Sequence, residues 1–277
     1  MSVDAAQVAY RDEFVAAFEQ RQSLLRQAVT TDVQIKGESA YFLVAGSGTD
    51  QAVTRGVNGL IPAKADTETQ NQCTLVEWHD LRRKTSFNIF ASQGDQRRIM
   101  QMNSMAVVNR KIDSDILAAL ASATLTTGAA ATGSLALAMY AYTILGNNDV
   151  EDDGNIYAVI SPAFRAYLMQ TKEFASADYV KGSPMDGPAP RMFDWAGVRW
   201  IVSTRITGKG TASEICYMFH KSAMGHACNT TGLATAIGYD EEQDYSFART
   251  SVFMGSKLLQ NTGIVKITHD GSAFAAV

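Results

Sequence analysis

Two cysteines and two histidines lie within thirteen positions of one another and are residue types that bind zinc. They are Cys216, His220, His226 and Cys228. Residues Ile215–Phe219 favour a strand, on which Cys216 and His220 would share a face but lie about 13 Å apart, too far to hold one ion. No C-x-x-C pair occurs among the four. We therefore predict no metal or cofactor site, and a metal- or thiol-dependent enzyme using Cys216–Cys228 stays a remote alternative.

Three further motifs resemble catalytic loops without matching them. Gly46-Ser47-Gly48 is not the G-x-S-x-G turn of a nucleophilic serine, and no third glycine follows at the spacing of a dinucleotide loop. Gly208-Lys209 lacks the upstream glycine of a P-loop, and Gly210 stands where Ser or Thr is required. Asp152-Asp153 favours a solvated turn over an acid–base pair. His79 and His269 have no partner that the sequence identifies. We expect no enzymatic turnover.

The elements that would position any site are organised around residues 92–123. This stretch has no proline and a single glycine, Gly94, near its start. Apolar residues recur at helical spacing, namely Met105, Val108, Ile112, Ile116 and Leu120. Ser92 or Asp95 would cap the helix, and the Ala-Thr-Gly run 121–133 would end it. The pattern predicts a helix about 40 Å long that serves as a beam.

The chain before this helix predicts an N-terminal helix followed by a long extension. Residues Asp4–Ala28 favour a helix, either on its own domain or as an arm that reaches a neighbouring subunit. Strand-forming residues at 33–44, 73–78 and 85–90 flank a glycine-rich segment with Pro62. A two-stranded ribbon is marginally stable alone in water. We expect this ribbon to lie on a partner subunit.

The chain after the helix predicts a compact α/β block and then strands without helices. A helix at 134–145 capped by Ser134, a strand at 156–160, and a helix opened by Ser161-Pro162 come first. An irregular loop at 182–190 and strands at 198–204 and 215–219 follow. Strands at 233–237, 247–259 and 264–268 would pack on the long helix. The predicted fold class is α+β, with the α/β block inserted in a second, elongated domain.

Seven basic residues lie between positions 82 and 111 with a single acid, Asp95, among them. They are Arg82, Arg83, Lys84, Arg97, Arg98, Arg110 and Lys111. One interpretation is a solvated face that pairs with neighbouring acids, including acids of adjacent subunits. The other is a weak surface for phosphates that does not read sequence.

Composition limits the class of protein. The 277 residues are 46% apolar and 19% charged, with a net charge of −4, which disfavours tight sequence-specific binding of nucleic acid. No apolar window of about 18 residues predicts a membrane span, and the first residues do not form a signal peptide. Three cysteines without framework spacing favour free thiols in a reducing compartment.

The order of these elements resembles the major capsid proteins of tailed double-stranded-DNA bacteriophages, the Hong Kong 97 fold. The resemblance covers essentially the whole chain. The segments that carry it are AYRDEFVAAFEQRQSLLRQAV as arm, RGVNGLIPAK as loop tip, SQGDQRRIMQMN and RKIDSDIL as spine helix, YAVISPAFRAYLMQ with WAGVRWIVSTR as inserted axial domain, and FARTSVFMGSKLLQNTGIVKI as returning strands.

The resemblance implies a division into an N-terminal arm, an extended loop, a peripheral domain with the spine helix, and an axial domain. The corresponding ranges are 1–29, 30–91, 92–130 with 226–258, and 131–225 with 259–277. The loop would overlie a neighbouring subunit, with Arg55 and Lys64 as candidate inter-subunit contacts. Some family members crosslink a loop lysine to an asparagine of another subunit. Lys64 is the one lysine that fits, but no acceptor or catalytic acid is identifiable, so crosslinking is not predicted.

The resemblance also implies the assembly and its partners. Hexamers and pentamers would close into an icosahedral virion capsid around double-stranded DNA, which the inner face would contact weakly and without sequence specificity. A portal and a separate scaffolding or decoration protein are expected, and a membrane is not. Assembly would take place in the cytoplasm of a bacterial host. An encapsulin-like nanocompartment shell protein is the alternative within the same fold.

Overall fold

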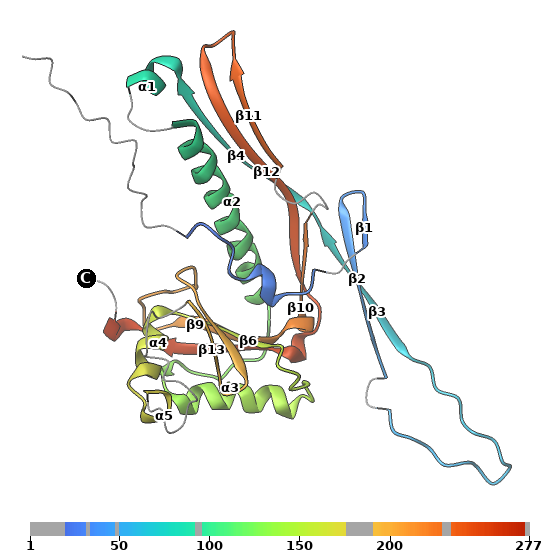
Figure 1. Cartoon of the computed structure of the whole chain (residues 1–277). Helices are drawn as coiled ribbons and strands as arrows, with labels where there is room; N and C mark the ends of the chain where they lie inside the picture. The colour runs from blue at the N-terminus through green and yellow to red at the C-terminus, as the bar shows by residue number, and fades with distance from the viewer. Residues whose placement is uncertain are drawn as a thin grey trace, which may run out of the picture.

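The computed structural model describes residues 20–31, 34–47, 50–91, 96–175, 191–228 and 234–274. Figure 1 shows a mixed α+β chain in which an elongated upper part stands on a compact lower part, and a ribbon projects away from both. In this part of the chain, no helix is both long and apolar enough to cross a membrane.

The upper part is built on the long helix α2 (Gln96–Leu120), which confirms the predicted beam. Its 25 residues give a length of about 37 Å. The predicted stripe is its buried face, since Val108, Ile112, Ile116 and Leu120 are all buried. The predicted caps Ser92 and Asp95 lie outside the described residues.

An antiparallel sheet packs against α2. Its central strand β12 (Tyr245–Leu258) pairs with β4 (Val76–Thr85) on one edge, and with β11 (Ala234–Asp240) and then β10 (Met224–Cys228) on the other. Along β12, the even-numbered residues 246–254 are buried and residues between them are more exposed. This alternation places one face of the sheet on the helix and leaves the other open.

The lower part contains a six-stranded mixed sheet in the order β5-β13-β9-β6-β8-β7. The strands are β5 (Ala131–Thr132), β6 (Ile156–Ile160), β7 (Met192–Trp195), β8 (Val198–Val202), β9 (Glu214–His220) and β13 (Ile264–Asp270). The helices are α3 (Leu135–Asn147), α4 (Pro162–Met169) and α5 (Lys172–Ala175). The predicted caps are confirmed, because Ser134 and Ser161 accept the N–H groups of Leu137 and Phe164. The loop predicted at 182–190 lies outside the described residues.

One predicted strand packs elsewhere than expected. β13 was expected on the long helix with the other late strands, but it pairs with β9 in the lower sheet. The chain leaves β12 through a short 3-10 turn, Asn261–Gly263, and so re-enters the compact part. The apolar alternation of a strand does not specify which of two sheets it joins, because both present an apolar face.

The ribbon consists of β2 (Ser39–Gly46) and β3 (Thr67–Thr74), with β1 (Gln34–Lys36) beside β2. The pairing runs from Ser39 opposite Thr74 to Gly46 opposite Thr67, which confirms a two-stranded extension. The strand predicted at 85–90 is wrong, since α1 (Ser86–Ala91) occupies it. Thr85 explains this difference, because its hydroxyl accepts the N–H of Asn88 and starts a helical turn.

The helix predicted to reach Ala28 is absent from the described part of that segment. Only a 3-10 turn, Arg26–Ala28, is regular there. The backbone N–H groups of Leu24 and Leu25 donate to the buried carboxylate of Asp113 on α2. A tertiary acceptor therefore replaces the carbonyls that a helix would supply. Residues before Gln20 lie outside the described residues.

Candidate functional site

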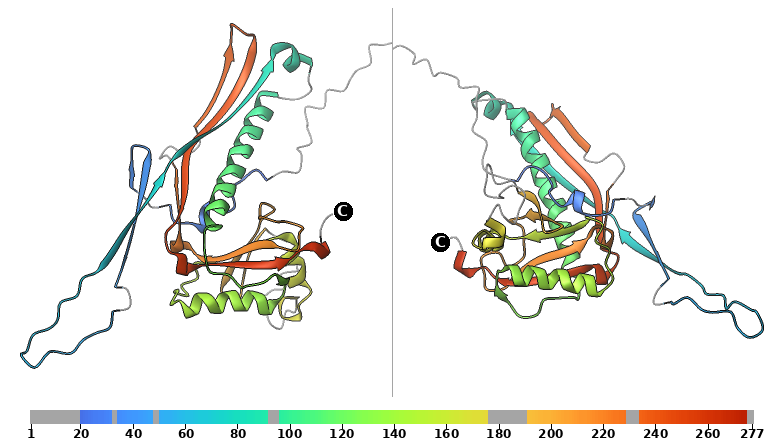
Figure 2. Two further views of the ribbon diagram at one scale, coloured as in Figure 1. Left: turned by 180° about the vertical axis from the view of Figure 1, so that it is seen from behind. Right: turned by 60° about the horizontal axis from the view of Figure 1, so that its bottom comes forward.

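The tip of the ribbon is the most exposed described segment of the molecule. Every residue from 50 to 70 is exposed. Val57 is fully exposed, and Leu60 and Ile61 are 74% and 64% exposed. Figure 2 shows that this loop extends away from the rest of the chain in both views. Three large apolar side chains without a core are typical of a surface that another molecule covers.

A short turn shapes this tip. The N–H of Gly59 donates to the carbonyl of Gly56, and the N–H of Gly56 donates to the carbonyl of Leu60. Gly59 has φ +73°, a left-handed conformation that favours glycine. The glycines that the sequence placed here thus close a turn and present the apolar residues around it.

The two loop residues expected to contact a neighbour differ in their surroundings. Lys64 donates to the carbonyl of Gln51 and lies 3.7 Å from the carboxylate of Asp50, so it is paired within its own loop. Arg55 is exposed and makes no hydrogen bond or ion pair with any described residue. Arg55 is therefore the more available cation for a carboxylate outside the chain.

The root of the ribbon packs on the upper sheet through two glycines. A Cβ atom at Gly225 would lie 2.8 Å from ring carbons of Phe42, and one at Gly255 would lie 2.7 Å from the sulfur of Cys73. Phe42 and Cys73 are buried and form a small core of their own with Ala40 and Ala227. Bare backbone on β10 and β12 thus lets the ribbon approach closely, which sequence patterns did not indicate.

The seven basic residues do not form one surface. Arg82 and Lys84 lie opposite buried residues of β12, on the helix side of the sheet, where they contact Asp80 and Gln96. Arg83 lies on the other side, 4.8 Å from the ring centroid of Tyr245.

The four basic residues on α2 are also spread along its length. Arg97 and Arg98 are exposed at the start of the helix, whereas Arg110 and Lys111 are half-buried near its middle. The Lys111 ammonium lies 3.8 Å from the ring centroid of Trp78, so it stabilises the contact between α2 and β4. The run therefore divides into residues that join α2 to the sheet and residues that face outward.

The four residues considered for zinc have separate partners. His226 contacts the Ser256 hydroxyl at 2.9 Å, and that hydroxyl donates to Asp115 at 2.7 Å. Burial, and then the charge of Arg26, lowers the pKa of His226 to about 4, so its ring is neutral near pH 7. The sulfur of Cys228 accepts from Arg26 at 3.2 Å.

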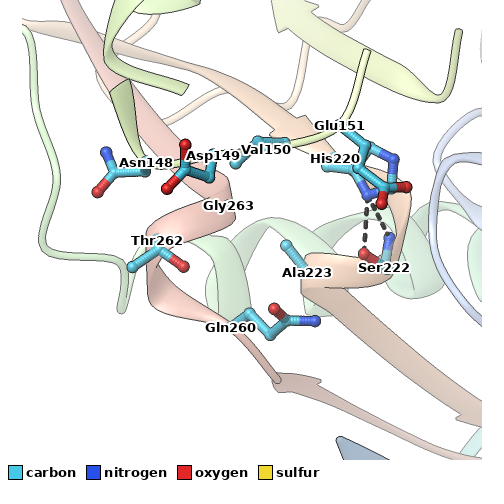
Figure 3. Close-up of a pocket in the computed structure, with 10 residues that line it drawn as sticks. All are labelled: Asn148, Asp149, Val150, Glu151, His220, Ser222, Ala223, Gln260, Thr262 and Gly263. Carbon is cyan, nitrogen blue, oxygen red and sulfur yellow. Dashed lines mark hydrogen bonds between the residues drawn. The ribbon is translucent and has the colours of Figure 1, made fainter. Parts of the chain in front are cut away.

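His220 lies in a polar cavity of about 310 Å³ at the junction of the two parts (Figure 3). Its Nε2 lies 3.0 Å from Asp153, and its Nδ1 lies 2.7 Å from the Ser222 hydroxyl. Serine, histidine and aspartate are the residue types of a catalytic triad. Here, however, the N–H of Ser222 also donates to Nδ1 of His220. His220 is thus the N-cap of the 3-10 turn Lys221–Ala223, and this cap accounts for the arrangement. Hydrogen bonds from Asn155, then from His220, hold the pKa of Asp153 below its usual range.

Cys216 has partners that sequence reasoning missed. It lies with Glu214 and His269 in a buried group whose ligand atoms are within 4.8 Å of one another. Glu214 and His269 are directly opposite each other on β9 and β13, which the sequence could not indicate because the two positions are 55 residues apart.

Comparisons with known proteins agree with this architecture. The sequence profile of a family described as "Phage capsid protein" matches residues 3–271. A comparison with curated protein sequences gives no match.

Solved structures of capsids share the fold. A chain from Mycobacterium phage Che8 superposes with a TM-score of 0.72 at 16% identity, covering 92% of this chain and 94% of that one. A chain from the capsid of cyanophage P-SCSP1u gives 0.71 at 13% identity, covering 93% and 90%. A chain from the capsid of Ralstonia phage GP4 gives 0.70 at 10% identity, covering 96% of each. At such identities the similarity establishes the fold, over nearly the full length of both chains.

Proposed function

Because this chain belongs to the phage capsid protein family, we propose that it is a major capsid protein whose hexamers and pentamers close into the icosahedral head of a tailed phage. Its role is structural and needs no turnover. The GTA particle and the phage capsids that share its fold give no support to a nanocompartment shell over this function.

The single observation that carries the proposal is the ribbon tip. Val57, Leu60 and Ile61 are exposed at the end of an extension that has no core of its own. Leaving such side chains in water costs about 25 cal/mol per Å² of apolar surface. A neighbouring subunit that covers the tip removes this cost, and each subunit of a closed shell has such a neighbour. Arg55 would add an ionic contact at the same interface.

In this proposal the chain has a Hong Kong 97-type organisation. Residues 1–29 are the arm, 30–91 the extended loop, 92–130 with 226–258 the peripheral domain, and 131–225 with 259–277 the axial domain. α2 is the spine helix. β4 belongs to the loop range 30–91 but pairs with β12 in the peripheral sheet. The separate upper and lower sheets support this division. The axial domain would point to the centre of each hexamer or pentamer.

The proposed partners follow from the same role. Packaged double-stranded DNA would meet the inner face through weak contacts that neutralise phosphate, and exposed Arg97 and Arg98 are the basic residues suited to them. A portal and a separate scaffolding or decoration protein complete the head, which assembles in the cytoplasm of a bacterial host.

Electron microscopy of the purified full-length protein, alone and with candidate scaffolding proteins of the same genome, tests the proposal. We expect closed shells with hexamers and pentamers, and each ribbon tip covered by a neighbour. A protein that stays monomeric at high concentration under all these conditions, with the ribbon tip uncovered, would contradict it.

A further inference from the structure

A glutamate, a cysteine and a histidine meet in the interior of the lower part. Glu214 and Cys216 project from the same face of β9, since they are two residues apart on a strand, and His269 lies opposite Glu214 on β13. All three side chains are 0% exposed. Their carboxylate oxygen, thiol sulfur and imidazole nitrogen lie within 4.8 Å of one another. These are three of the ligand types that zinc prefers.

Three polar atoms of this trio lack hydrogen bonds inside the described protein. Both ring nitrogens of His269 and Oε2 of Glu214 are buried without such a partner. His269 Nδ1 lies 3.2 Å from Oε2, but the two atoms do not have hydrogen-bond geometry. A buried polar atom without a partner is destabilising, and three such atoms in one place point to a ligand between them.

The surroundings hold the trio in place. The N–H of Gly210 donates to Oε1 of Glu214, which leaves Oε2 directed at the histidine. A Cβ at Gly271 would lie 2.5 Å from the carboxylate carbon, so this glycine lets the backbone close over Glu214. The His269 ring packs 5.0 Å from the ring centroid of Phe164 on α4. Such outer contacts orient metal ligands and keep a site dry.

Charge balance favours a divalent cation between these three side chains over the three side chains alone. All three side chains are withdrawn from water, and a carboxylate so placed is costly unless a positive charge compensates it. A cation of charge +2 with one carboxylate and one thiolate gives a neutral site.

We propose that Glu214, Cys216 and His269 form a structural zinc site that joins β9 to β13. On binding, the thiol loses its proton to solvent as the zinc–sulfur bond forms, while the carboxylate and the neutral imidazole donate lone pairs. Sulfur, nitrogen and oxygen donors together select zinc over magnesium or calcium. Side-chain rotations shorten the spread of the ligand atoms, and a fourth position is left for an oxygen ligand. Because the site is buried, the metal enters during folding and stabilises the lower part.

Metal analysis of the full-length protein tests this inference. Protein purified without chelator from zinc-supplemented cells should contain about one zinc per chain by mass spectrometry, and protein from zinc-depleted cells should melt several degrees lower. Cobalt-grown protein should show thiolate-to-cobalt charge-transfer absorption. Cys216→Ser, which changes only the donor atom, should lose both the metal and that absorption.

Cys228→Ser is the matched control, because its thiol lies on β10 in the upper sheet and contacts Arg26. It should keep the zinc and the cobalt spectrum. If the wild-type protein carries fewer than about one zinc per ten chains and melts at the same temperature from both media, the trio is only a buried ion pair beside a thiol. Loss of metal in Cys228→Ser, with Cys216→Ser unchanged, would equally overturn the assignment. The wild-type measurement decides the question even where a variant fails to fold.

Discussion

The carboxylate of Asp113 on α2 accepts the backbone N–H of Leu25 at 3.2 Å and so joins positions 88 residues apart. The same buried carboxylate accepts the N–H of Leu24 at 3.1 Å, the hydroxyl of Ser23 at 2.6 Å and the amide of Gln20. Four donors saturate a carboxylate. Helix α2 therefore also anchors residues 20–25, which lie far from it in the sequence.

Replacing Asp113 by alanine should lower the free energy of unfolding by about 3 kcal/mol, because buried N–H donors lose a charged acceptor. Asn keeps one acceptor, so Asp113→Asn should lose less. Hydrogen exchange should rise at residues 20–30 in both variants, as mass spectrometry of peptides would show. Asp66→Ala, in the exposed loop, is the control and should change neither quantity. Unchanged exchange at 20–30 in Asp113→Ala would refute the anchor.

Alanine at Gly225 or Gly255 should dislodge the root of the ribbon. The new Cβ would meet Phe42 or Cys73 at 2.7–2.8 Å, closer than real Cβ contacts allow, so the ribbon must shift. We expect a loss of about 1–3 kcal/mol in urea unfolding and defective assembly by size-exclusion chromatography. Gly146→Ala on α3 is the control, since nothing lies within 4 Å of its Cβ, and it should stabilise by up to about 1 kcal/mol. Equal behaviour of all three variants would show that close packing is not what holds the ribbon.

Deleting Asp50–Asp66 should leave the monomer folded and abolish assembly. No buried residue lies in this range, so circular dichroism and the melting temperature should be unchanged while microscopy shows no shells. The point substitution Arg55→Ala should weaken assembly less, because an exposed ion pair contributes about 0–1 kcal/mol. An unfolded deletion variant would instead place the loop in the core of its own chain.

The double variant Arg97→Gln, Arg98→Gln should form intact empty shells that retain less DNA. Binding of DNA by free wild-type subunits should be weak and should fall steeply with salt, because it depends on counterion release. Filter binding at two salt concentrations and gradient sedimentation of shells measure these effects. Lys209→Gln, on a turn of the lower part, is the control. Blocked shell formation with unchanged DNA affinity would show that the two arginines pair with acids of neighbouring subunits.

His226 should make stability depend on pH between about 6.5 and 4. Its pKa in the folded chain is about 4, chiefly because of burial, against 6.5 for an exposed imidazole. Above pH 6.5 the ring is neutral in both states. As the pH falls, the unfolded chain takes up a proton that the folded chain rejects, and stability falls by up to about 3 kcal/mol at pH 4. Urea unfolding of wild type and His226→Gln at pH 7 and pH 4.5 should show a larger decrease in the wild type. An equal decrease in stability in both proteins would show that groups other than His226 cause the pH dependence.

The elements with a strong local signal could be predicted from the sequence. The helical spacing of Val108, Ile112 and Ile116 predicted α2, and Ser134 and Ser161 predicted the starts of α3 and α4. These succeed because periodicity and capping depend on residues within one or two turns. The ribbon and its exposed tip were predicted from strand-forming residues on both sides of a glycine-rich segment.

Tertiary structure alone decided which distant residues meet. β13 joins the lower sheet although its sequence suits either sheet. The basic run divides because successive residues of a strand point to opposite faces, so that Arg83 lies on one side and Arg82 on the other. The need for glycine at positions 225 and 255 is evident only in the tertiary structure, where Phe42 and Cys73 lie against the bare backbone. His269 has no partner within its own segment, and the register of β9 against β13 supplies Glu214, because strand pairing sets side-chain neighbours that local sequence does not encode.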